Sequence, residues 1–193
     1  MTDITSDGVS SRRNSRSNGS DAGAGSARHD APDPCRREEL VAYAELLFFA
    51  YRDFTSDPDA VLEQYSFGRA HHRVLHFVHR HPGLRVANLL DILKITKQSL
   101  ARVLKELIEK GFVLQKAGSA DRRERRLFVT AKGGRLIEKL TSLQVRRIEE
   151  ALATAGPGAQ DFTRRFLFAM ITQSDRDRVE TLIKLPPDTS GSD

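Results

Sequence analysis

The clearest pattern of apolar and polar positions lies between residues 97 and 109. Apolar side chains recur there at the three- and four-residue spacing of one helix face: Leu100, Val103, Leu104, Leu107 and Ile108. The remaining positions are polar or charged, and the two acidic ones late in the segment, Glu106 and Glu109, are expected to face solvent. Thr96 suits the N-cap, since its hydroxyl accepts a backbone N–H, and Gly111 suits the left-handed residue that ends a helix. The pattern therefore predicts an amphipathic helix with one buried face.

The segments around this helix predict a winged helix-turn-helix. A shorter apolar pattern predicts a helix at about 86–93, directly after Pro82-Gly83, which ends the element before it. After Gly111, two β-prone runs at 112–114 and 127–129 flank a loop crowded with arginines. Short helix, turn, longer helix and basic hairpin follow one another in the order of that motif, so the fold class expected is mainly α with a small β-hairpin wing.

Longer helices are expected on both sides of this motif. One covers about 34–54 and is broken by Asp57-Pro58, a second covers 67–79, and two more cover about 131–154 and 159–184. The second helix is expected to bury one stripe: Ala70, His71, Val74, Leu75 and Val78. The outer helices carry wide aromatic faces that a small winged domain cannot cover. They predict a homodimer in which these helices pack across a two-fold axis.

The chain is therefore expected to divide into five regions. Residues 1–34 lack large apolar side chains and are expected to form a disordered tail. The other expected regions are a dimerisation helix and connector at 35–66, the DNA-binding domain at 67–133, dimerisation helices at 134–185 and a flexible tail at 186–193.

Composition narrows the classes of protein. The net charge of +5 is compatible with nucleic acid as a partner. Cys35 is the only cysteine, which excludes an intrachain disulfide and a cysteine-rich zinc site and fits a reducing cytoplasm. No apolar run approaches the length of a membrane span, and no motif of an enzyme is found. A cytoplasmic protein without catalytic residues, cofactor or membrane contact is expected.

The polar face of the main helix offers side chains that can read DNA. Gln98 can bond adenine and Arg102 guanine, each through paired hydrogen bonds. Lys97 and Lys105 suit phosphates, and Thr96 and Ser99 begin the same helix. The loop between the β-prone runs adds arginines to this surface: Arg122, Arg123 and Arg125. Beside such a loop, a DNA-binding face is favoured over a merely solvated one.

The histidines and the cysteine are weaker candidates for a site. His72, His76 and His79 share one face of the second helix, and His71 lies on its inner stripe. Ordinary packing explains them best; the alternatives are a crevice lining, a pH-sensitive group or a metal site. If an effector pocket exists, its expected lining is Phe48, Tyr51, His72 and His76. Cys35, beside two arginines at a helix start, is a candidate for redox sensing.

The wing region carries the most specific resemblance to a known family. Asp121 and Arg123 are followed by Leu127, Val129-Thr130 and Gly133, and this spacing resembles the pattern of the MarR family of bacterial transcriptional regulators. The resemblance implies that Arg123 enters the minor groove and that Asp121 braces it by a charge-assisted hydrogen bond. In one departure, Lys94 stands in the helix-turn-helix turn, where many members have glycine.

The same resemblance implies a regulatory mechanism. Members are dimers and often repressors; many are released from DNA by a small aromatic or lipophilic acid, some by oxidation and a few by metal. We therefore expect a homodimeric repressor on a palindromic double-stranded DNA operator, with a small-molecule effector. The alternatives are a redox- or metal-responsive regulator of the same family and an architectural winged-helix protein without sequence preference.

Overall fold

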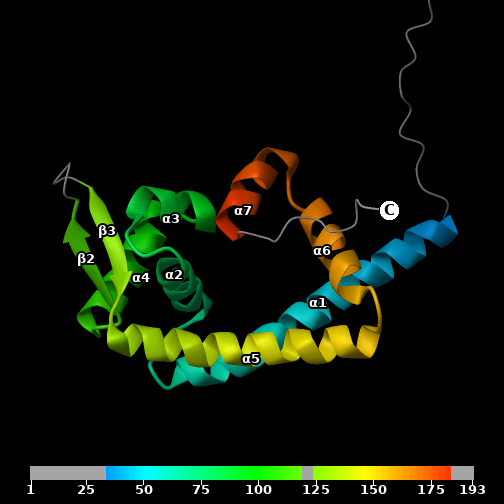
Figure 1. Cartoon of the computed structure of the whole chain (residues 1–193), viewed down its shortest axis with the longest axis horizontal. Coiled ribbons are helices and arrows are strands. Elements are labelled where there is room, and N and C mark those ends of the chain that lie inside the picture. The colour runs from blue at the N-terminus through cyan, green and yellow to red at the C-terminus, as the bar shows by residue number, and fades with distance from the viewer. Residues whose placement is uncertain (1–33, 119–123, 184–193) are drawn as a thin grey trace, which may run out of the picture. The chain divides into compact units, whose positions relative to one another are not determined.

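The computed structural model describes residues 34–118 and 124–183 of the chain, which divides into two compact units, Met1–Val41 and Ala42–Asp193. The elements are α1 (Pro34–Glu63), α2 (Arg69–Arg80), β1 (Leu84–Arg85), α3 (Val86–Leu93), α4 (Lys97–Glu109), β2 (Val113–Ala117), β3 (Arg125–Val129), α5 (Ala131–Ala155), α6 (Ala159–Ala169), a 3₁₀ turn (Gln173–Asp175) and α7 (Arg176–Ile183) (Figure 1). The expected fold class, mainly helical with a small β wing, is confirmed. The tails at 1–33 and 184–193 lie outside the described residues.

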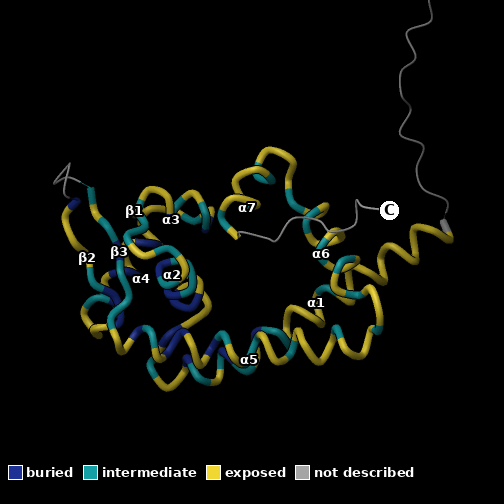
Figure 2. Tube along the Cα trace, viewed as in Figure 1, coloured by how far each residue is buried: buried dark blue, intermediate teal, exposed yellow. Residues whose placement is uncertain are grey.

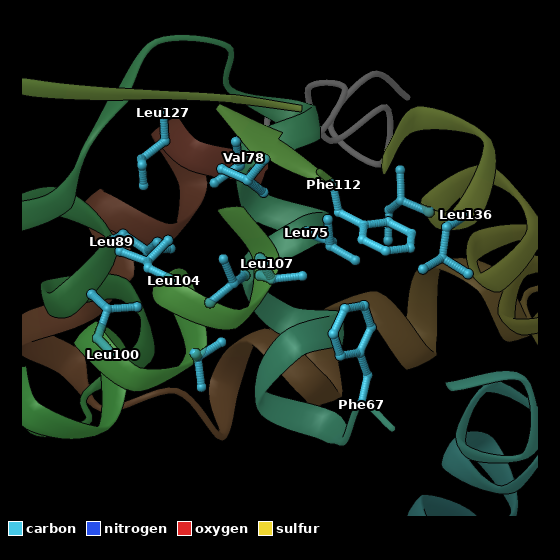
Figure 3. Close-up of a cluster of buried hydrophobic side chains, with 14 of the residues drawn as sticks. Phe67, Leu75, Val78, Leu89, Leu100, Leu104, Leu107, Phe112, Leu127 and Leu136 are labelled. Carbon is cyan, nitrogen blue, oxygen red and sulfur yellow. The ribbon is translucent and has the colours of Figure 1, made fainter. Parts of the chain in front are cut away.

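The hydrophobic core surrounds α2. This helix contacts α3, α4, β3 and α5, and its inner stripe of Val74, Leu75 and Val78 is fully buried. Figure 3 shows Leu75, Leu107 and Phe112 pointing toward one another. Each such side chain contributes about 1.5–3 kcal/mol by leaving water. Ala70, which was also expected on this stripe, is instead exposed.

The wing is a three-stranded antiparallel sheet in the order β1-β3-β2. β3 pairs with β2 from Val113 opposite Val129 to Ala117 opposite Arg125, so the hairpin extends further toward its tip than the apolar runs predicted. On its other edge, β3 pairs with the two residues of β1, where Leu84 lies opposite Leu127. So short a strand has no periodicity to detect, and the sequence did not predict it.

Both predicted ends of α4 are confirmed. The Thr96 hydroxyl accepts a hydrogen bond from the Ser99 backbone N–H at 3.1 Å. At the other end, Gly111 has φ +73°. The Phe112 N–H then donates to the Leu107 carbonyl at 2.8 Å, and the Gly111 N–H donates to Ile108 at 3.0 Å. These two bonds form the Schellman motif, which fixes the direction in which the chain leaves α4 for the wing.

The end of α4 is joined to the start of α5 by backbone contacts. Thr130 caps α5 by accepting the Gly133 N–H at 3.1 Å, and its hydroxyl donates to the Gly111 carbonyl at 2.7 Å. Its own N–H donates to the Phe112 carbonyl at 3.0 Å. A Cβ at Gly133 would lie 2.1 Å from that carbonyl oxygen, so only glycine fits. The Thr130 and Gly133 spacing therefore fixes α5 against α4.

The predicted break of the first helix at Asp57-Pro58 is wrong. α1 continues through Pro58 to Glu63. An interior proline costs about 3 kcal/mol, but the last turn is anchored by Leu62, which is fully buried in the core. Asp57 also pairs with Arg147 of α5 at 2.9 Å, and Asp59 with Arg69 at 2.8 Å. Tertiary packing therefore outweighs the local signal.

The single helix predicted at 159–184 is also wrong, because the chain forms α6, a 3₁₀ turn and α7 there. The Arg176 guanidinium donates to the carbonyls of Ala169 at 2.6 Å and Ile171 at 3.0 Å. It thereby satisfies backbone acceptors that the end of α6 leaves open. Asp175 N–H donates to the Thr172 carbonyl at 2.9 Å and closes the turn between the helices.

Candidate nucleic-acid interface

α4 presents its polar face to solvent. Six residues predicted to contact DNA are exposed on this helix or at its cap: Thr96, Lys97, Gln98, Ser99, Arg102 and Lys105. The opposite face is locked into the core through Leu100, Val103, Leu104 and Leu107, which are all buried. Because the helix cannot rotate without exposing that stripe, the orientation of Gln98 and Arg102 is set by packing.

The side chains on this face differ in how free they are. The Thr96 hydroxyl bonds both the backbone and the hydroxyl of Ser99, so these two residues build the helix start. Helix N-termini with such caps suit phosphate groups. Lys105 lies 3.8 Å from Glu109 in a weak, exposed ion pair. Gln98 and Arg102 have no such restraint within the described chain and are available for base edges.

Glu106 does not face solvent as expected. Its carboxylate lies 3.0 Å from His71 Nε2, while His71 Nδ1 accepts the Gly68 backbone N–H at 3.1 Å. Since Nδ1 accepts, the proton of the neutral ring is on Nε2 and is donated to Glu106. His71 also stacks on Phe67, with ring centroids 4.6 Å apart. This histidine therefore connects the start of α2 to α4 and has a structural role.

The wing brings further charge beside α4. Arg125 is exposed at the start of β3, whereas Asp121, Arg122 and Arg123 lie outside the described residues. Glu124 joins two arginines, with Arg85 at 2.9 Å and Arg126 at 3.2 Å. This bridge ties β1 to β3. This bridge was not predicted from the sequence, although Glu124 is the only acidic residue between four arginines.

A groove of about 560 Å³ separates α4 from the wing strands. Its floor is apolar and includes Leu90, Leu104 and Ile108. Its rim is polar and basic: Lys97, Lys105, Gln115 and Arg125. Basic side chains from α4 and from the wing therefore border the same groove, and such side chains suit DNA phosphates. Gln115 was not predicted, because its place on the rim depends on strand register.

The chain has a strong match among known proteins. The model of the MarR family matches residues 65–124. The helix-turn-helix transcriptional regulator PetP of Rhodobacter capsulatus is 46% identical over 145 residues, which cover 75% of this chain and 87% of PetP. The chain belongs to the MarR family.

Solved structures support the same fold. The crystal structure of MarR superposes with a TM-score of 0.57 at 22% identity, covering 79% of this chain and 97% of MarR. A SlyA-like regulator from Listeria monocytogenes gives 0.50 at 20% identity, covering 79% of this chain and 93% of that one. Family membership makes this MarR-family chain a DNA-binding transcriptional regulator and not an enzyme. No helix within the described residues is both long and apolar enough to cross a membrane.

A second pocket of about 440 Å³ lies where α1, α2 and α5 meet; we call it the inter-helix pocket. Its lining is Tyr51, Phe54, Thr55, Arg69, His72, Arg73, His76, Phe77 and Gln144. Three of the four predicted effector residues are therefore brought together, but Phe48 does not line it and is 73% exposed. Arg69 and Arg73, which were not predicted, supply its positive charge.

His72 cannot be the cationic partner of an acid in this pocket at neutral pH. The pKa of His72 is lowered to about 4, mainly by burial and to a smaller extent by the nearby charge of His76, against an opposing effect of Asp59. The ring is therefore neutral between about pH 5 and 8. A histidine that must become charged on acidification also makes the folded state less stable as pH falls from about 6.5 toward 4.

The remaining candidates show little that supports a sensing role. Cys35 is exposed in the first turn of α1, within the first compact unit. Among the described residues, no three His, Cys, Asp or Glu side chains are grouped so that they could hold a metal ion. Neither observation favours a redox- or metal-responsive regulator over one that responds to a small molecule.

Proposed function

We propose that this MarR-family regulator is a homodimeric repressor that binds a palindromic operator with one α4 in each of two successive major grooves. The observation that carries the proposal is the exposed polar face of α4, held in a fixed orientation by its buried stripe. Two-fold symmetric dimers of this kind read half-sites about 10 bp apart. Its place of action is the cytoplasm, where the DNA of a bacterium lies.

Each basic residue has a proposed part in this complex. Gln98 and Arg102 read base edges in the major groove, while Lys97 and Lys105 contact phosphates. Arg125 continues the basic surface onto the wing. Arg123, braced by Asp121, enters the minor groove, a role that rests on the family motif since both lie outside the described residues. Arg122 joins the same wing contacts.

Dimerisation is proposed for the helices outside the winged domain. In a single chain, these helices expose large apolar side chains to water: Tyr43, Leu46, Phe48, Phe49, Tyr51, Val145, Ile148, Phe162, Phe166, Leu167 and Met170. Exposed apolar surface on this scale marks an interface. A second copy is the occupant favoured by palindromic DNA, since an interface between identical patches generates the two-fold axis.

Release by a small aromatic or lipophilic acid is the regulation proposed for the inter-helix pocket. Its aromatic residues, Tyr51, Phe54 and Phe77, offer an apolar lining, and Arg69 and Arg73 suit a carboxylate. The pocket includes residues of α1 and α5, so a ligand there contacts the helices that set the spacing of the two recognition helices.

The test is selection of bound duplexes from a random pool, followed by affinity measurements over a range of salt. An inverted repeat is expected. Arg102→Ala should weaken binding to the selected site by about tenfold to a hundredfold and relax the preference at one position. Lys105→Ala should weaken binding to selected and random DNA alike and reduce the salt slope by about one.

Arg146→Ala is the matched control, because it removes an exposed arginine from α5, away from the recognition face. It should leave the affinity unchanged. If no sequence is enriched, or if Arg102→Ala affects selected and random duplexes equally, the chain is an architectural winged-helix protein. A reporter gene behind the selected site then distinguishes repression, the expected result, from activation.

A further inference from the structure

The wing carries a row of three basic side chains across its three strands. Arg85 of β1 lies opposite Arg126 of β3, and Lys116 of β2 lies opposite the same arginine on its other side. Residues opposite each other in neighbouring strands have their side chains on the same face of the sheet, and like charges at such positions destabilise the pairing. We call these three residues the basic row. A nearby anion relieves the repulsion within it.

The basic row lies on the face of the wing that is turned away from the groove beside α4. Neighbouring residues of a strand point to opposite faces of the sheet. Gln115 and Arg125, each next to a member of the row, line that groove, and no member of the row is among the described residues that line it. The wing therefore offers cations on both of its faces, and the proposed DNA contacts of the described residues use only one of them.

A single carboxylate supplies the counter-charge for two members of the row. Glu124 accepts a hydrogen bond from Arg85 at 2.9 Å through Oε1 and one from Arg126 at 3.2 Å through Oε2. A phosphate offers the same kind of paired acceptor oxygens to arginine. Lys116 makes no ion pair within residues 34–118 and 124–183, and its ammonium lies 5.4 Å from the centre of the Phe128 ring. The row thus keeps an excess of positive charge.

Both arginines can be reached from solvent while they are paired. The side chain of Arg85 is 55% exposed and that of Arg126 is 41% exposed, whereas that of Glu124 is 24% exposed. Ion pairs at exposed positions contribute little to stability and are screened by salt. A phosphate that reaches these arginines can therefore take the place of the carboxylate with little loss of stability.

Arg85 also stands at a point where a DNA backbone is expected to pass. It is the N-cap of α3, the first helix of the helix-turn-helix, and its side chain makes no cap hydrogen bond. When the second helix of such a motif lies in the major groove, the first helix crosses the DNA backbone. The free backbone N–H groups at a helix N-terminus suit a phosphate. A phosphate at the start of α3 would lie beside the basic row.

We propose that the basic row is a second phosphate-contacting surface of the wing, and that Glu124 is an internal competitor that occupies Arg85 and Arg126 in the free protein. When DNA binds, a backbone phosphate replaces the carboxylate on these arginines, and repulsion between the phosphate and the displaced Glu124 lowers the affinity. Glu124 therefore limits the electrostatic part of binding, which is independent of sequence. This inference rests on the proposed contact between the wing and DNA, but it requires no operator.

The first test is Glu124→Gln, which keeps the shape of the side chain and removes its charge. The affinity of the full chain for a random-sequence duplex, measured by fluorescence anisotropy over a range of salt, should rise about fivefold, with a salt slope larger by about one. Glu150→Gln is the matched control, because it removes the charge of an exposed glutamate that pairs with Arg146 on α5. It should leave both values unchanged.

A purely structural role of the Glu124 bridge predicts the opposite result. Loss of the tie between β1 and β3 would loosen the wing and weaken binding, whereas loss of a competitor strengthens it. Unchanged or weaker binding by Glu124→Gln would therefore overturn the proposal. Urea denaturation of each variant ensures that affinities are compared among folded chains.

A double-mutant cycle tests whether Glu124 acts through Arg85. Arg85→Ala should weaken binding by less than about twofold in the unsubstituted chain, where Glu124 holds this arginine, but by about fivefold in the Glu124→Gln background. Lys116→Ala removes a cation of the same row that Glu124 does not hold, so it should weaken binding equally in both backgrounds. Equal effects of Arg85→Ala in both backgrounds would overturn the competition.

This test and the selection of an operator can fail separately. The duplexes are random, so failure to enrich a sequence leaves the affinities of the Glu124 variants interpretable. Absence of an effect at Glu124 leaves base reading by α4 intact, because Arg102→Ala tests that contact.

Discussion

The winged half of the molecule, from α2 to β3, and the outer helices α1 and α6 place the same types of apolar residue in opposite environments. Around α2, leucines such as Leu75, Leu107 and Leu127 are fully buried, whereas Phe48 and Phe162 on α1 and α6 are 73% and 67% exposed. Figure 2 shows the contrast, with buried positions on α2, α4 and the first part of α5 and exposed positions along α6. Both halves show helical periodicity in the sequence. The winged half completes its own core, whereas the outer helices leave large apolar side chains exposed.

The largest effect that tests this contrast is expected at Gly133. Gly133→Ala places a Cβ 2.1 Å from the Phe112 carbonyl oxygen, which belongs to backbone and cannot rotate away. We expect a loss of about 3 kcal/mol in the free energy of unfolding, measured by urea denaturation. Gly134→Ala is the matched control, since nothing lies within 4 Å of its Cβ. It should be neutral or stabilising by up to about 1 kcal/mol.

Equal stabilities for these two alanine variants would show that the α4–α5 junction can yield, and that the winged half is less rigid than its contacts indicate. The Thr130 bonds to Gly111 and Phe112 argue against such yielding. In the sequence, the spacing of Val129-Thr130 and Gly133 was only a resemblance to a family pattern. The α4–α5 junction gives this spacing a physical reason.

A smaller effect is expected for the outer helices, where the change acts on association. Phe162→Glu introduces a charge into the proposed dimer interface, twice per dimer because of the two-fold axis. We expect the dimer dissociation constant to rise by about a hundredfold or more, measured by sedimentation equilibrium. Arg165→Glu, at an exposed position of α6 away from the face that carries Phe162, Phe166 and Leu167, should change it little.

A monomer at micromolar concentration in the unsubstituted chain would contradict the proposed dimer. So would a Phe162→Glu variant that associates as tightly as the Arg165→Glu control. The winged half should remain folded in either variant, because its buried core receives nothing from α6. Specific DNA affinity should fall with dimerisation, since a single half-site offers half of the contacts.

The contrast also explains which predictions from sequence succeed. α4 was predicted well because its cap, apolar stripe and terminal glycine are local signals that agree with one another. The helix break predicted at Pro58 was wrong, because the burial of Leu62, four residues later, depends on tertiary packing and has no local signature. The last helix was predicted as one piece, because the role of Arg176 in capping the carbonyls of Ala169 and Ile171 depends on a chain reversal.

Candidate sites follow the same rule. The candidate DNA-contacting residues of α4 were correctly predicted to share one exposed face, because one helix carries them at a known spacing. Glu106 was misplaced because its partner, His71, lies on another helix. The inter-helix pocket was only partly anticipated, since Arg69 and Arg73 join it through the packing of α2 against α1 and α5. Residues that function together across elements need the packed structure to be recognised.

The smallest effect is expected at Lys94, where α7 meets the helix-turn-helix. Lys94 has φ +52°, a left-handed conformation that favours glycine, and its ammonium lies 3.3 Å from Asp175. Lys94→Gly and Lys94→Ala both remove the ion pair, but only glycine relieves the backbone. We expect the glycine variant to be more stable than the alanine variant by about 1 kcal/mol in thermal unfolding. Equal stabilities would mean that the turn is not strained.

Asp175→Ala completes the comparison, because it removes the ion pair and keeps the lysine backbone. The pair is partly exposed, so its coupling in a double-mutant cycle with Lys94→Ala should be only a few tenths of a kcal/mol. Arg178 makes a parallel contact from α7 to Asp91 of α3, at 3.7 Å. Because such contacts are weak and screened, we expect that α7 can move relative to α3 with only a small loss of free energy. A coupling above about 1 kcal/mol would instead mean that α7 is rigidly joined to the winged half, and that the boundary between the two halves lies before α7.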